Sequence, residues 1–184
     1  MYEAAVKDAL YTVINNNTST LLSGLTQQGK ARQMQIVKEI LAPAQYSYYV
    51  ALAVENMRTW EDSGVHGTNA ATGTFRAEYN CVVEVFEYAR ALPGDLHTYE
   101  NAGEDFDLLV ARVIKLLREQ ASFTSSVHGS HSFKLGRLAD PRDQRPINVE
   151  IADLPPTTTG GQPAFYARLL FTLTECSMSL AGAA

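Results

Sequence analysis

Hydrophobic and polar positions alternate along residues 74–89, TFRAEYNCVVEVFEYA. This alternation predicts a half-buried β-strand, because successive side chains of a strand point to opposite faces of the sheet. We expect the face that runs from Phe75 to Val85 to pack in the core. The polar members of the second face are Arg76, Glu78 and Asn80. That face is interrupted by the apolar side chains of Val82, Phe86 and Tyr88.

Four further segments read as strands. Residues 45–56 are rich in aromatic and β-branched side chains, and we expect them to pair antiparallel with 74–89. Residues 132–138, 147–153 and 164–176 follow later, and the last of these adds Tyr166 and Leu170 to the second face. Glycine, proline and small polar residues predict long loops at 61–73 and 154–163 and a flexible tail at 179–184.

Helical spacing of apolar residues occurs in three places. Residues 2–15 carry a continuous apolar stripe, and residues 30–41 have Met34, Val37 and Ile40 at helical spacing before Pro43. The strongest pattern lies at 102–120, where Asn101 and Glu104 have the spacing of a capping box. Its predicted buried stripe is Phe106, Leu109, Val110, Val113, Leu116 and Leu117.

This order of elements predicts a single α+β domain over residues 1–184, an antiparallel β-sheet covered by amphipathic helices on one face. The other face should then be polar, yet roughly half of it is apolar, which is typical of a surface that contacts a partner. The candidate subunit or partner interface is Val82, Phe86, Tyr88, Tyr166 and Leu170. The candidate wet or lumen-facing residues are Arg76, Glu78 and Asn80. The alternative is that later strands cover this face within the monomer, and both remain open.

Composition narrows the classes of function. The 184 residues carry a net charge of −5, which argues against a general nucleic-acid-binding surface but not against contact with passing DNA. No apolar run approaches a membrane span, and the charged N-terminal stretch does not resemble a signal peptide. Without a secretory signal, we expect Cys81 and Cys176 to be small buried hydrophobic residues rather than a disulfide.

The sequence offers no recognisable catalytic or metal-binding motif. His128 and His131 are three apart in HGSH, but no cluster of Cys, Asp or Glu adjoins them, so polar loop histidines are the simpler interpretation. The glycines of 64–73 lack the Lys-Ser/Thr and the following helix of a phosphate loop. We therefore expect no enzyme activity, no catalytic residue, no cofactor and no metal.

The chain resembles the tail terminator proteins of tailed bacteriophages. The resemblance covers about residues 2–178 and rests on the order of the elements YSYYVALAVEN, TFRAEYNCVVEVFEYA, NAGEDFDLLVARVIKLLREQ and YARLLFTLTEC after an N-terminal helix. It implies a hexameric ring that caps the tail tube, ends its polymerisation and joins it to the head-side connector. DNA would pass through the lumen without specific binding. The extra segment NNNTST to QQGKARQMQIVKEIL departs from the simple pattern.

The resemblance also implies a location in the virion, at the neck or tail end, after assembly in the host cytoplasm and without a membrane. Two other functions remain open. One is another phage neck component, such as a head–tail connector or stopper. The other is a small α+β enzyme, in which His97, His128 and His131 would be the first residues to test.

Overall fold

A computed structural model describes residues 3–25, 34–38, 48–62, 74–88, 99–127, 129–136, 147–154 and 164–179. These residues form three helices and seven strands. In chain order they are α1 (Glu3–Asn16), α2 (Thr18–Leu21), β1 (Met34–Val37), β2 (Tyr48–Asp62), β3 (Thr74–Tyr88), α3 (Tyr99–Glu119), β4 (Phe123–Ser125), β5 (His131–Leu135), β6 (Ile147–Leu154) and β7 (Ala164–Ser179).

The strands form one curled sheet in the order β1-β2-β3-β7-β5-β4, with β6 also paired to β7. The strands β5 and β6 lie along the same side of β7, β6 on residues 164–171 and β5 on residues 173–175. Only the β1–β2 pair is parallel, and the other pairs among these strands are antiparallel. The α+β class is confirmed, and so is the antiparallel pairing of the segments 45–56 and 74–89.

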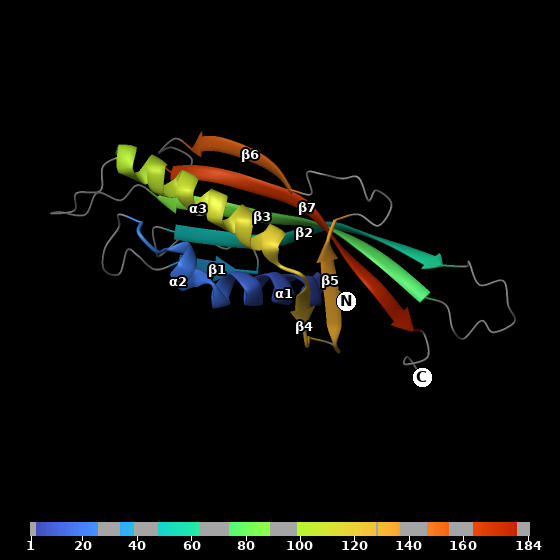
Figure 1. Cartoon of the computed structure of the whole chain (residues 1–184). Coiled ribbons are helices and arrows are strands. Elements are labelled where there is room, and N and C mark those ends of the chain that lie inside the picture. The colour runs from blue at the N-terminus through green and yellow to red at the C-terminus, as the bar shows by residue number, and fades with distance from the viewer. Residues whose placement is uncertain are drawn as a thin grey trace, which may run out of the picture.

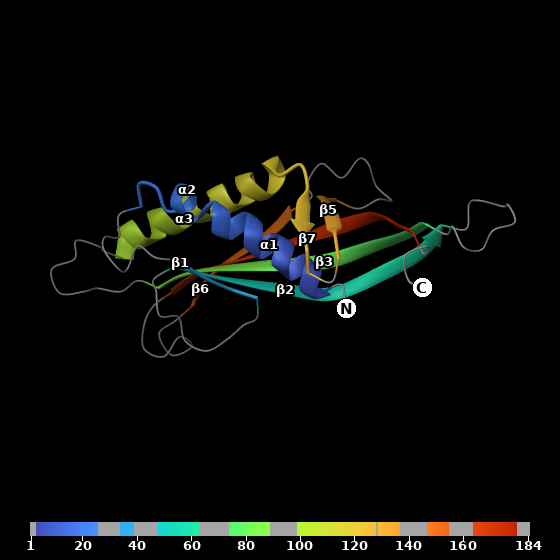
Figure 2. The same cartoon turned by 90° about the horizontal axis from the view of Figure 1, so that it is seen from below.

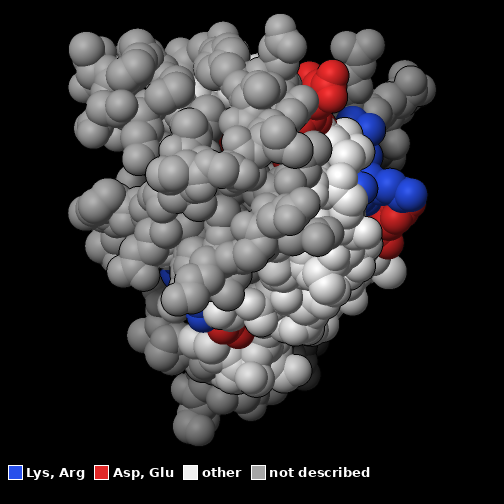
Figure 3. Space-filling model, turned by 90° about the vertical axis from the view of Figure 1, so that its left-hand side faces the viewer, with Lys and Arg blue, Asp and Glu red and all other residues white. Residues whose placement is uncertain are grey.

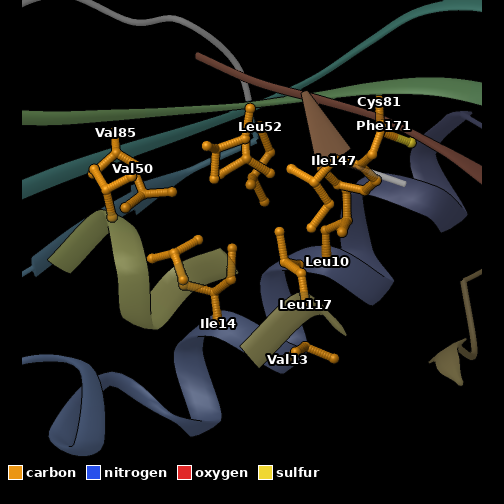
Figure 4. Packing of buried hydrophobic residues seen from close by; sticks show 14 of the residues in the cluster. Leu10, Val13, Ile14, Val50, Leu52, Cys81, Val85, Leu117, Ile147 and Phe171 are labelled. Atoms are coloured by element: carbon orange, nitrogen blue, oxygen red, sulfur yellow. The ribbon is translucent and has the colours of Figure 1, made fainter. Parts of the chain in front are cut away.

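All three helices lie on one side of the sheet, as the view from below shows (Figures 1 and 2). The predicted stripes face the strands: α1 buries Ala5 through Ile14 at helical spacing, and in α3 only Leu116 of the predicted stripe is half-buried rather than buried. The core forms where these stripes meet the odd-numbered face of β3 (Figure 4). The strand residues at its centre are Val50, Leu52, Cys81, Val83, Val85, Leu169 and Phe171.

One aspartate on α1 holds both ends of the curled sheet. The Asp8 Oδ1 accepts a hydrogen bond from Lys38 Nζ at 2.7 Å, just after β1, and its Oδ2 accepts one from Ser125 Oγ of β4 at 2.8 Å. The bond with Lys38 lowers the pKa of Asp8 despite its partial burial. Since β1 and β4 are the two ends of the strand order, the sheet curls around α1.

The ends of β2, β3 and β7 run on past the helices (Figures 1 and 2). We call this three-stranded projection the β-arm and define it as residues 58–62, 74–78 and 174–179, which stay paired through Asp62↔Thr74 and Thr74↔Ser179. The predicted loop 61–73 therefore begins later, since Glu61 and Asp62 belong to β2, and the predicted tail loses Ser179 to β7. The remainder of both segments lies outside the described residues.

The helix predicted at 30–41 is wrong where the structure describes it. Residues Met34–Val37 form β1, which pairs in parallel with Tyr48–Ala51. A short apolar run fits a helix and a strand equally well by periodicity, and here the pairing with β2 decides the conformation.

The N-terminus of α3 also differs from the prediction. The helix begins at Tyr99, so Asn101 lies inside its first turn and is not the capping residue. An asparagine inside a helix costs only about 0.7 kcal/mol relative to alanine, which packing of the long apolar stripe easily outweighs.

Arg112 fastens α2 to α3. Its Nη1 donates hydrogen bonds to the carbonyl oxygens of Leu21, at 2.8 Å, and of Ser23. Leu21 ends a helix of four residues, where backbone acceptors lack intrahelical donors, and Ser23 follows just after that end. The chain then turns at Gly24, whose φ of +72° favours glycine.

We expect Arg112→Ala to lower the free energy of unfolding by about 1.5–3 kcal/mol, because two carbonyls lose a charged donor. Arg118→Ala is the matched control, since Arg118 is an exposed arginine of the same helix and should change stability by less than about 0.5 kcal/mol. Urea denaturation followed by circular dichroism measures both. Equal stability of the two variants would contradict a fastening role for Arg112.

Candidate interface on the second face of the sheet

The second face of the sheet is the side that points away from α1, α2 and α3. Residues that alternate with the core positions of β2, β3 and β7 build it, and the ladder aligns them in rows across the three strands. The rows are Tyr49–Phe86–Tyr166, Ala51–Glu84–Arg168, Ala53–Val82–Leu170 and Asn56–Asn80–Thr172. Aromatic, charged, apolar and amide side chains thus succeed one another along the strands.

The first row is aromatic. The rings of Tyr49 and Phe86 meet edge to face with centroids 5.6 Å apart, and those of Phe86 and Tyr166 are tilted at 4.9 Å. Tyr49 is buried, whereas Phe86 and Tyr166 are both partly exposed. Two neighbouring aromatic side chains of the predicted interface therefore remain accessible on this face.

The second row carries charged side chains, and its Arg168 lies among several acidic residues. The guanidinium pairs with Glu55 beside the β-bulge of β2 and approaches Glu150 of β6 at 3.9 Å. The hydroxyl of Tyr166 donates to Glu84 Oε1 at 2.8 Å. Burial, followed by that hydrogen bond, raises the pKa of Tyr166, so the hydroxyl stays protonated and acts as a donor at neutral pH.

The third row corrects one predicted contact residue. Val82 is only 2% exposed, so it is already covered within the chain and offers no surface to another subunit. Its neighbour across the ladder, Leu170, is half-buried. The side chain of Tyr88 lies outside the described residues, which leaves Phe86, Tyr166 and Leu170 as the accessible members of the predicted interface.

The predicted wet residues differ in how exposed their side chains are. Glu78 is buried, at 8% exposure, because it lies on the central strand of the β-arm between Arg58 of β2 and Thr174 of β7. Asn80 is partly exposed and donates to Asn56 Oδ1 at 2.6 Å, while its own Oδ1 accepts from Thr172. The side chain of Arg76 lies outside the described residues.

Two buried polar clusters on the helix-covered face were missed by sequence reasoning. In the first, Glu87 of β3 is fully buried opposite Tyr48 of β2, and the Tyr48 hydroxyl donates to Asp105 Oδ2 of α3 at 3.1 Å. Burial raises the pKa of Glu87 to about 9, with the nearby Asp105 carboxylate as the second cause. The Glu87 carboxyl is therefore protonated at neutral pH.

In the second cluster, Glu175 of β7 joins two strands. Its Oε2 accepts from the Tyr79 hydroxyl at 3.1 Å, and its Oε1 lies 2.7 Å from Nδ1 of His131. All three side chains are buried, and the ring of Phe133 stacks on His131. The prediction of a polar loop histidine is wrong for His131, which belongs to β5 and points into the core. The alternation of His131 and Phe133 in HSFKL was the available signal.

Neither cluster has the ligand set of a metal centre. Among the described residues, no group of three or more His, Cys, Asp or Glu side chains could hold a metal ion. Cys81 is a free, buried cysteine, as predicted, and burial raises the pKa of its thiol to about 12, so it is unreactive at neutral pH. The side chains of Cys176, His66, His97 and His128 lie outside the described residues.

Described side chains of both charge signs are visible at one end of the molecule (Figure 3). On the end of the molecule that lies at the left of Figure 1, described acidic and basic side chains lie next to one another (Figure 3). Over the described part of the chain, no helix has the length and apolar composition needed to span a bilayer.

Comparison with known proteins gives a distant structural likeness. No protein-family model and no curated protein matches the sequence. A solved structure, the sheath/tube terminator of the extracellular contractile injection system PVC in its extended state, aligns with a TM-score of 0.28 and 10% sequence identity. The alignment covers 91% of this chain and 58% of the terminator chain, so this chain spans less than two thirds of that protein.

Proposed function

We propose that the protein is a structural virion component, a tail terminator that assembles as a ring, caps the tail tube and joins it to the head-side connector. The accessible aromatic pair on the second face, Phe86 and Tyr166, carries this proposal. An antiparallel sheet with helices on one side usually keeps its other side polar. Partly exposed aromatic side chains, on the same face as the half-buried Leu170, are instead typical of contacts between proteins.

The second face suits a specific contact because it is patterned. Aromatic and apolar rows flank the charged row of Glu84 and Arg168, so a neighbour must match both the apolar and the charged positions. Charge complementarity of this kind fixes the register of an interface more than it adds affinity. A ring requires such a heterologous contact, in which one surface of each copy meets a different surface of the next.

The order of elements supports the choice of a terminator among ring proteins. The helix α1, the long β2–β3 pair, the helix α3 and the closing strand β7 follow in the order on which the resemblance to phage tail terminators rests. A mildly acidic net charge of −5 suits a lumen through which DNA passes without binding.

Electron microscopy of tail tubes tests the proposed role directly. Tubes of the phage that encodes the protein are polymerised with and without it and imaged at their ends. We expect a ring of additional density at one end of the tube and shorter tubes, because the cap stops growth. Tubes of unchanged length with bare ends would refute the terminator role. A ring that binds only the isolated connector would indicate another neck component.

We expect Phe86→Asp to impair assembly more than folding. Phe86 is partly exposed and contacts the rings of Tyr49 and Tyr166, so its loss should cost about 1–2 kcal/mol of stability. A buried charge in the subunit contact should raise the concentration for half-assembly at least tenfold. Analytical ultracentrifugation measures assembly, and urea denaturation measures stability.

Two control variants, one at a buried and one at an exposed position, show how this result is to be interpreted. Val82→Asp, on the same face of the same strand but buried, should unfold the chain. Ser132→Asp, at an exposed position of β5, should leave both folding and assembly unchanged. If Phe86→Asp behaves like Val82→Asp, the aromatic row is internal core, and if it behaves like Ser132→Asp, the row does not contact another subunit.

A further inference from the structure

At the level of β1, where β6 and not β5 lies along β7, the two lateral edges of the sheet are β1 and β6. The ladder connects them through β2, β3 and β7, so each residue of β1 shares a row with one residue of β6. Met34 shares its row with Asp153, Gln35 with Ala152, Ile36 with Ile151 and Val37 with Glu150. No described strand pairs with the outer side of β1 or of β6.

The two edges also run in opposite directions. The strand β1 is parallel to β2, β2 and β7 are each antiparallel to β3, and β6 is antiparallel to β7. It follows that β1 and β6 are antiparallel to each other. If copies of the chain stand side by side in the same orientation, β6 of one copy meets β1 of the next as an antiparallel pair at matching height.

Exposure of β6 fits this arrangement. Two large hydrophobic side chains are exposed among the described residues, and Ile151, at 60%, is the more exposed of them. Its neighbours Glu150 and Ala152 are exposed too. An edge strand with an exposed branched apolar residue is a template for pairing with another chain. On β1, Ile36 is half-buried and lies on the same side of the sheet as Ile151.

We infer that β6 of one copy pairs with β1 of a second copy of this chain, antiparallel and with Ile151 opposite Ile36. The interface is heterologous, because β1 and β6 are different surfaces. The β1 at one end of an open row and the β6 at the other can therefore each pair with a further copy, or with one another to close a ring. The main-chain ladder supplies affinity and the isoleucine pair fixes the register. This inference rests on the ring in the proposed function and adds an edge-to-edge pairing to the contact of the second face proposed there.

Disulfide trapping tests the pairing. Copies with Ile36→Cys are mixed with copies that carry Ile151→Cys, both in a Cys176→Ser background, and oxidised. Opposite residues of an antiparallel pair have Cα atoms about 4.5–5.5 Å apart, within the range of a disulfide. We expect a linked product of twice the monomer mass in the mixture and at least tenfold less in either variant alone. Ile36→Cys mixed with Leu108→Cys is the control, because Leu108 is an exposed apolar residue of α3.

Ile151→Lys gives a second, independent test. A lysine on the edge should raise the concentration for half-assembly at least tenfold, whereas Leu108→Lys should not, and circular dichroism checks that both variants fold. Assembled rings without the Ile36–Ile151 link, or a link between two copies of Ile151→Cys, would overturn the edge pairing while leaving the terminator role intact. A specific link in a protein that does not cap tubes would support the pairing and refute the role.

Discussion

Replacing Glu87 with glutamine is expected to raise the free energy of unfolding at pH 7 by roughly 3 kcal/mol and to leave it almost unchanged at pH 4. Glu87 is fully buried on the helix-covered face of β3. Burial, reinforced by the Asp105 carboxylate, raises its pKa from 4.5 to about 9. Glutamine has the shape of the protonated acid but never needs to lose a proton on unfolding.

The sign follows from proton binding. Below pH 4.5 the carboxyl is protonated in both states, so it contributes no pH dependence. Between pH 4.5 and 9 only the folded state keeps the proton, and stability falls as the pH rises, by about 1.4 kcal/mol for each pH unit. Because pH 7 lies 2.5 pH units above 4.5, the folded protein has lost roughly 3 kcal/mol of stability at pH 7. Above pH 9 the loss levels off, because both states are then ionised.

Urea denaturation of both proteins at a series of pH values from 4 to 9 measures the difference directly. We expect the stability difference between variant and natural protein to grow steadily with pH. Asp105→Asn keeps an acceptor for the Tyr48 hydroxyl but removes the second cause of the shift, so the slope should begin to level off at a lower pH. A difference that is independent of pH, or a variant less stable at pH 7, would show that Glu87 is ionised in the folded protein.

The sequence predicted the parts of the fold that local periodicity controls. The stripes of α1 and α3 and the alternation of β3 place most of the core, because each element must bury one face. The same alternation put Glu87 on the core side with Tyr79 and Val85, so a buried carboxyl could have been predicted from parity alone. Alternation could not predict that the Asp105 carboxylate lies near Glu87, because that proximity depends on how α3 lies across the sheet.

The second face of the sheet was predicted, but the exposure of single residues on it was not. Alternation identified the second face and its aromatic row, but it could not show that Val82 and Glu78 are covered while Phe86 stays accessible. Burial on one face varies with what lies beside each residue, which sequence spacing does not encode. The short strand β1 was missed for a related reason: a four-residue strand is stabilised by its partner β2 rather than by its own pattern.

The second buried cluster should make Glu175 the most sensitive position of the β5–β7 pair. Its carboxylate lies against the Tyr79 hydroxyl at 3.1 Å and Nδ1 of His131 at 2.7 Å. We expect Glu175→Leu to lower the free energy of unfolding by about 3 kcal/mol, because both buried groups lose this acceptor and each lost contact costs about 1–3 kcal/mol. Urea denaturation measures the loss, and amide hydrogen exchange should show faster exchange in β4 and β5.

Removing the whole cluster should cost less than removing its centre. In the triple variant Tyr79→Phe, His131→Leu and Glu175→Leu, the three polar groups of the contact are replaced together by apolar side chains of similar size. We expect this variant to recover at least half of the stability that Glu175→Leu loses, while Tyr79→Phe alone should cost about 1 kcal/mol. If the triple variant is as unstable as Glu175→Leu, the loss comes from packing around Phe133 and not from the severed hydrogen bonds, because only packing would be lost equally in both.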